Sequence, residues 1–101
     1  MALWDEAPVQ ERILDFLDAQ QLLASFTSMG GVALREGAHC QCQLVEAGKE
    51  ENILSCLVDF EEELGFGAAE RQRLRQQGEL HVLLGTNGEV RDAWLCRGNS
   101  C

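Results

Sequence analysis

Residues 50–64, EENILSCLVDFEEEL, carry the pattern on which the predicted architecture depends. Apolar side chains recur there at i, i+4, i+7 and i+11, which is the spacing of one face of an α-helix. Gly65 follows directly, in the position where a helix commonly ends. The pattern predicts a core helix over Glu50–Leu64. Its apolar face holds Ile53, Leu57, Phe60 and Leu64, and its outer side holds Asp59, Glu61, Glu62 and Glu63.

The segment from Val9 to Leu23 has a second helical pattern. Its large apolar residues fall on one side of a helical wheel and its acidic residues fall on the other. Asp5 is a suitable N-cap, and Pro8 is tolerated in a first turn. We expect an amphipathic helix with an acidic outer face. Its apolar side holds Val9, Ile13, Phe16, Leu17 and Leu23, and its acidic side holds Glu11, Asp15 and Asp18.

A third, shorter helix is predicted over Ala68–Gln77 from residue propensity. Leu74 is its only large apolar residue, so this helix should lie mostly in solvent, and Gly78 should end it. It carries the only basic cluster of the chain, Arg71, Arg73 and Arg75.

Two hairpins are predicted from alternating apolar residues and turn residues. In the first, over Val32–Val45, Arg35-Glu36-Gly37 is a three-residue loop with glycine in the left-handed conformation. In the second, the loop is Thr86-Asn87-Gly88, which pairs Leu84 with Val90 and Leu80 with Trp94. A two-residue Asn-Gly turn is the alternative, but it leaves the apolar face mixed.

The elements give an α+β fold in the order α-β-β-α-α-β-β. Two hairpins form a four-stranded, mainly antiparallel sheet, and the helices pack on one face of it. The length of 101 residues suits a single domain over residues 1–101, because it allows one core of ordinary size.

The net charge of -9 makes direct binding of nucleic acid an unfavourable hypothesis, since phosphate backbones are repelled. The N-terminal residues lack the basic and apolar regions of a signal peptide, and no stretch reaches the ~20 apolar residues of a membrane span. We therefore expect a cytoplasmic protein that does not contact a membrane.

The five cysteines are an odd number, which favours free thiols in a reducing compartment. Cys40 and Cys42 would share the core face of a strand and His39 would point the other way, so a zinc site at these residues has an unfavourable spacing. His81 is predicted opposite Ala93, without a paired carboxylate. No set of nucleophile, base and electrophile can be named, and we expect neither an enzyme nor a cofactor.

These features favour a noncatalytic protein-binding module, such as an adaptor, an inhibitor or a secretion-type chaperone. Its partner should be a protein with a basic surface, and a homodimer is the other assembly that we consider. The candidate contact residues are Asp59, Glu61, Glu62 and Glu63, followed by Asp15 and Asp18. One alternative is an acidic mimic of nucleic acid that blocks a basic groove of an enzyme. The other is a thiol or zinc protein that uses Cys40 and Cys42.

Overall fold

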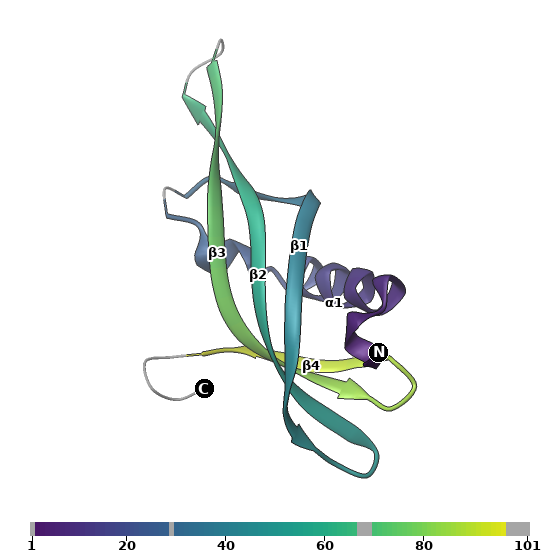
Figure 1. Cartoon of the computed structure of the whole chain (residues 1–101). Coiled ribbons are helices and arrows are strands. Elements are labelled where there is room, and N and C mark those ends of the chain that lie inside the picture. The colour runs from purple at the N-terminus through teal and green to yellow at the C-terminus, as the bar shows by residue number, and fades with distance from the viewer. Residues whose placement is uncertain (1, 29, 67–69, 97–101) are drawn as a thin grey trace.

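A computed structural model describes residues 2–28, 30–66 and 70–96 of the chain. It shows an α+β fold in which one N-terminal helix precedes a four-stranded antiparallel meander with the strand order β1-β2-β3-β4 (Figure 1). The helical part consists of the 3-10 helix η1 (Leu3–Asp5), the helix α1 (Ala7–Ala19) and the 3-10 helix η2 (Leu23–Phe26). The strands are β1 (Val32–Ala47), β2 (Glu51–Phe66), β3 (Glu70–Gly85) and β4 (Val90–Leu95).

The first three strands are unusually long and set the shape of the molecule. Each has 16 residues, and the longest dimension of the molecule is 52 Å. At about 3.3 Å per residue, one such strand spans roughly 53 Å. The β2–β3 hairpin therefore runs along the whole molecule, as Figure 1 shows.

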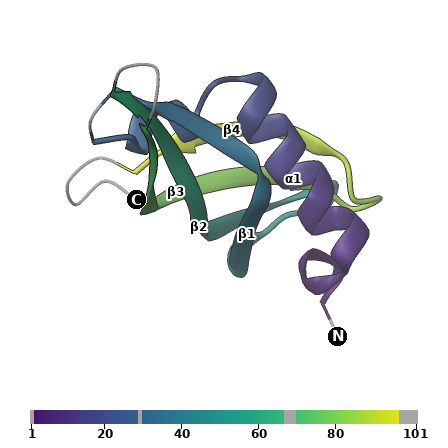
Figure 2. The same ribbon diagram turned by 90° about the horizontal axis from the view of Figure 1, so that it is seen from above.

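One face of the sheet holds the core. Side chains alternate between the two faces of a strand, and the even-numbered residues from Leu54 to Phe60 and from Leu80 to Leu84 lie in the core with α1. From above, α1 lies beside β1 at one side of the sheet (Figure 2). The predicted apolar side of the first helix is confirmed for Val9, Ile13 and Leu17, which are buried. The strand residues in this core include Leu54, Cys56, Val58, Phe60, Leu80, Val82 and Leu84.

The predicted helix over Glu50–Leu64 is wrong, because this segment is the central strand β2. Its even-numbered residues from Leu54 to Leu64 are all buried, which is the period of a strand. Glu62 interrupts this apolar row in the sequence. Ile53 and Leu57 are four residues apart, so the sequence also fits a helix. The segment forms a strand because it pairs with β1 on one side and with β3 on the other.

Two further elements also differ from the predicted order α-β-β-α-α-β-β. Over the described residues 70–77, the predicted third helix is the first half of β3, which pairs with β2. The predicted loop Arg35-Glu36-Gly37 is a bulge inside β1, since residues 35–38 lie opposite Phe60 between the pairs Leu34–Glu61 and His39–Asp59. Gly37 does have a positive φ of 78°, as the turn pattern required, but β1 continues beyond it.

The second hairpin is confirmed with its predicted loop. Gly85 and Glu89 close the turn over residues 86–88, Gly88 has a φ of 88°, and Leu84 pairs with Val90. The register shifts between Leu83 and Leu84, however. Trp94 therefore lies opposite His81, and the predicted pairings of Leu80 with Trp94 and of His81 with Ala93 are wrong.

The prediction of free thiols is wrong for Cys42, Cys56 and Cys96. Cys42 and Cys56 lie directly opposite each other on β1 and β2, with their Cα atoms 4.1 Å apart, and form a disulfide. Cys96 is disulfide-bonded as well, and Cys101 lies outside the described residues. Cys40 is a free, buried thiol on the core side, as the strand pattern predicted. The predicted helix had separated Cys56 from Cys42, so the sequence pattern did not bring the pair together.

Candidate functional site: the outer face of the sheet

The face of the sheet that points away from α1 is formed by the odd-numbered residues of β2 and β3 and their neighbours. We call it the outer face. None of the helices in the described part of the chain packs on it. Its middle is made of cross-strand rows in the order β1, β2, β3 and, where it reaches, β4. These rows are His39–Asp59–Gln77, Gln41–Leu57–Glu79 and Gln43–Ser55–His81–Trp94.

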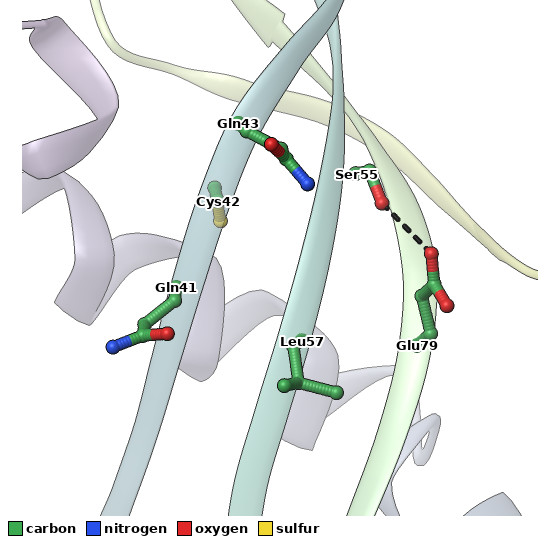
Figure 3. Close-up of a pocket in the computed structure, with 6 residues that line it drawn as sticks. All are labelled: Gln41, Cys42, Gln43, Ser55, Leu57 and Glu79. Carbon is green, nitrogen blue, oxygen red and sulfur yellow. Dashed lines mark hydrogen bonds between the residues drawn. The ribbon is translucent and has the colours of Figure 1, made fainter.

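Two adjoining hollows form one groove along these rows, which we call the outer groove. The larger has a volume of about 390 Å³ and is lined by Gln41, Cys42, Gln43, Ser55, Leu57 and Glu79 (Figure 3). The smaller, of about 160 Å³, is lined by His39, Cys40, Gln41, Leu57, Asp59 and Gln77. Gln41 and Leu57 line both hollows, so the groove is continuous. His39 and Gln43 are four residues apart on β1, which corresponds to a distance of about 13 Å along the groove.

Glu79 lies in the groove with one oxygen held by the protein. Ser55 Oγ donates a hydrogen bond of 3.0 Å to Glu79 Oε1, and Figure 3 shows the two side chains meeting between β2 and β3. Among the described residues, no arginine or lysine forms an ion pair with Glu79. The carboxylate is therefore an exposed negative charge that no cation of residues 2–28, 30–66 or 70–96 neutralises.

Trp94 lies on β4, in the row next to that of Glu79. Its ring meets the ring of His81 edge-on, with the ring centres 5.7 Å apart, so both lie on the outer face. His81 is only 6% exposed, whereas Trp94 is 37% exposed. Glu79 and Trp94 are diagonal neighbours on adjacent strands. Residues in this relation lie about 7–8 Å apart, and long side chains can bridge that distance. The carboxylate thus lines the groove from β3, and the aromatic ring lies beyond it on β4, on the same side of the groove.

The predicted acidic residues on β2 divide between the two faces of the sheet. Asp59, Glu61 and Glu63 lie on the outer face, next to arginines of β3. Arg75 Nε lies 2.6 Å from Asp59 Oδ1, and Arg73 Nε lies 3.6 Å from Glu63 Oε2. Asp59 Oδ1 is buried and accepts no hydrogen bond, so its interaction with Arg75 is an electrostatic attraction between opposite charges. These ion pairs reduce the negative potential that the acidic run would otherwise produce.

Glu62 has a structural position instead. Its side chain faces the core side and is 0% exposed. Its carboxylate accepts hydrogen bonds from Gly31 N at 2.6 Å, from Ser28 N at 3.0 Å and from Gln76 Nε2 at 2.9 Å. Glu62 therefore ties the segment between η2 and β1 to the sheet, and it contributes no exposed charge for a partner.

The acidic residues of α1 lie apart from the outer groove. Arg35 of β1 binds Asp15 Oδ1 through its Nε at 2.8 Å and also binds the carboxylate of Glu11. Asp18 is exposed on the same helix. The structure thus gives Asp15 a role in holding α1 against β1, and it does not bring Asp15 or Asp18 together with the acidic residues of β2.

The chain was compared with family models, curated proteins and solved structures. No match was found. The outer groove is therefore the feature from which a function is proposed. Of the residues that line it, Asp59 was among the predicted contact residues, whereas Ser55, Leu57 and Glu79 were not. Trp94, which lies beyond the lining residues on β4, was also not predicted. The signal for Ser55 and Leu57 was the alternation from Leu54 to Phe60, which puts odd-numbered residues opposite the core.

Cys40, Cys42 and Cys56 do not form an open thiol site. Cys42 is bonded to Cys56, so Cys40 and Cys42 are not two free thiolates. Burial raises the pKa of the Cys40 thiol to about 11, with a smaller contribution from the negative charge of Glu11. The part of the chain that the structure describes contains no group of three His, Cys, Asp or Glu residues arranged to hold a metal ion. It also contains no helix with the length and apolarity needed to cross a membrane.

Proposed function

We propose that the protein is a noncatalytic protein-binding module and that the outer groove is its contact surface. The observation that carries the proposal is an open groove on a sheet face that no described helix covers. At its centre Leu57 is 44% exposed, among the amide side chains of Gln41 and Gln43. An apolar side chain surrounded by hydrogen-bonding groups is typical of protein contact surfaces.

The positions of the reactive groups also favour binding over catalysis. Cys40 is buried, and its raised pKa keeps the thiol protonated at neutral pH. His81 is buried against Trp94. The acidic mimic of nucleic acid is less well supported, because Arg73 and Arg75 stand beside the carboxylates that would imitate phosphates.

The proposal is tested by affinity capture from native lysate with three forms of the protein. Leu57→Glu places a charge in the groove. Leu44→Glu is the matched control, since Leu44 is 43% exposed but does not line the groove. We expect a stoichiometric partner that the wild type and Leu44→Glu retain and that Leu57→Glu loses. Equal retention of the same partner by all three forms would rule out the groove as the contact surface.

A further inference from the structure

We infer that the outer groove binds an extended peptide segment that places one arginine or lysine side chain between Glu79 and Trp94. The inference rests on the proposed function and specifies the chemistry of the partner. It follows from the length of the groove, from the groups that line it, and from a carboxylate on β3 and an aromatic ring on β4 along one side of it.

The length and lining of the groove fit an extended chain. About 13 Å from His39 to Gln43 corresponds to roughly four extended residues. Gln41, Gln43 and Gln77 line the groove, and each amide side chain both donates and accepts hydrogen bonds, as a peptide backbone requires. Leu57 lies between them and offers an apolar contact to a side chain of the segment.

The charge of the groove selects a cation. Asp59 and Glu63, on the same face, already have Arg75 and Arg73 as partners. Glu79 has no such partner among the described residues, and Ser55 holds only its Oε1. The chain as a whole carries a net charge of -9, so its field attracts a basic segment. A cation of the bound segment would donate a charge-assisted hydrogen bond to Glu79 and neutralise its charge.

Trp94 provides the second contact for the same cation. Its ring is partly exposed and is held from one side by the edge-on contact with His81. Because Glu79 and Trp94 are diagonal neighbours, a long cationic side chain that binds Glu79 has this ring within reach, and cations bind favourably over the face of an indole. Arginine suits both contacts, because its planar group stacks on aromatic rings and donates to carboxylates at the same time.

The test is an NMR titration with defined probes. The first probe is the blocked peptide acetyl-Ala-Ala-Arg-Ala-Ala-amide, and the second replaces arginine by citrulline, which has the same shape without the charge. We expect the arginine peptide to shift the Trp94 indole signal and the amide signals of Ser55 and Glu79. The citrulline peptide should bind at least about fivefold more weakly. Glu79→Gln should reduce the affinity for arginine to the citrulline level, and Asp18→Asn should leave it unchanged.

Four outcomes would overturn the inference. Equal affinity of both peptides at the outer face would leave the proposed function standing but remove the cation from it. The absence of any shift at the outer face at millimolar peptide would count against both. Shifts of equal size on α1 would indicate diffuse attraction to negative charge. Binding of spermidine as strong as that of the arginine peptide would point to a small polyamine. The comparison of the two peptides uses the wild-type protein, so it stands even if Glu79→Gln does not fold.

Discussion

Replacing Glu62 by alanine should destabilise the protein far more than the same change at its neighbour Glu61. The Glu62 carboxylate is fully buried and accepts hydrogen bonds from two backbone N–H groups, of Ser28 and Gly31, and from Gln76. Glu61 is only partly buried and lies on the outer face, opposite Arg75. The two residues are adjacent in the sequence, so the pair of variants compares the two faces of one strand.

The magnitude follows from the loss of the hydrogen bonds from Ser28, Gly31 and Gln76. A hydrogen bond to a charged group contributes about 1.5–3 kcal/mol, and a buried donor left without a partner adds a desolvation penalty. Ser28 and Gly31 are partly accessible to water, which can replace part of the loss. We therefore expect Glu62→Ala to lower the free energy of unfolding by about 2–4 kcal/mol. Glu61→Ala should lower it by less than about 1 kcal/mol.

The assay is urea unfolding of both variants, followed by circular dichroism. With a slope of about 1–2 kcal/mol per molar urea, the midpoint of Glu62→Ala should fall by roughly 1–3 M without a change of slope. The midpoint of Glu61→Ala should stay close to that of the wild type. Equal midpoints for the two variants would refute the assignment of Glu62 to the core side of β2.

Three further predictions concern the packing and the thiols. Gly78→Ala places a Cβ 2.2 Å from Phe26 Cδ1, so urea unfolding should show a loss of about 1–3 kcal/mol that disappears in a Phe26→Ala background. A penalty that persists there would contradict the contact. The double replacement of Cys42 and Cys56 by alanine should lower the free energy of unfolding by about 3 kcal/mol, because the disulfide closes a loop with a sequence separation of 14. The pKa of Cys40 is raised to about 11, so its thiolate forms only as the pH rises towards that value. At pH 8 native Cys40 should react with iodoacetamide roughly two hundredfold more slowly than an ordinary thiol, and a rate that levels off by about pH 9 would contradict this.

Local sequence patterns were sufficient to predict the N-terminal helix and the turn of the last hairpin. The buried side of α1 followed from its helical period, and the turn at residues 86–88 followed from the position of Gly88. Both elements depend on contacts between residues close in the chain. The register beyond that turn was not predictable, because the irregularity between Leu83 and Leu84 moves Trp94 opposite His81.

The central strand was mispredicted because its deciding partners are distant in the sequence. Glu62 breaks the apolar alternation, and its place in the core side depends on donors from Ser28 and Gly31, more than thirty residues away. The same error hid the groove. A helix over residues 50–64 puts Leu57 on a core face and does not bring Ser55 beside Glu79.

The acidic run of β2 shows why composition alone did not locate the contact surface. A count of charges cannot tell that Asp59 and Glu63 face arginines of the next strand. Nor can it tell that Glu79, an isolated carboxylate in the sequence, lies in a groove beside Trp94. The pairing of β2 with β3 makes this distinction, since it sets which charges neutralise each other.

The most direct test of the outer face as the binding surface is paramagnetic broadening of NMR signals by a nitroxide on the bound arginine peptide. The account predicts that the methyl signals of Leu57 and the indole signal of Trp94 lose intensity, while the amide signals of Asp15 and Asp18 on α1 keep theirs. Loss of intensity on α1 with unchanged Leu57 and Trp94 signals would contradict it and would place the binding surface on the helix.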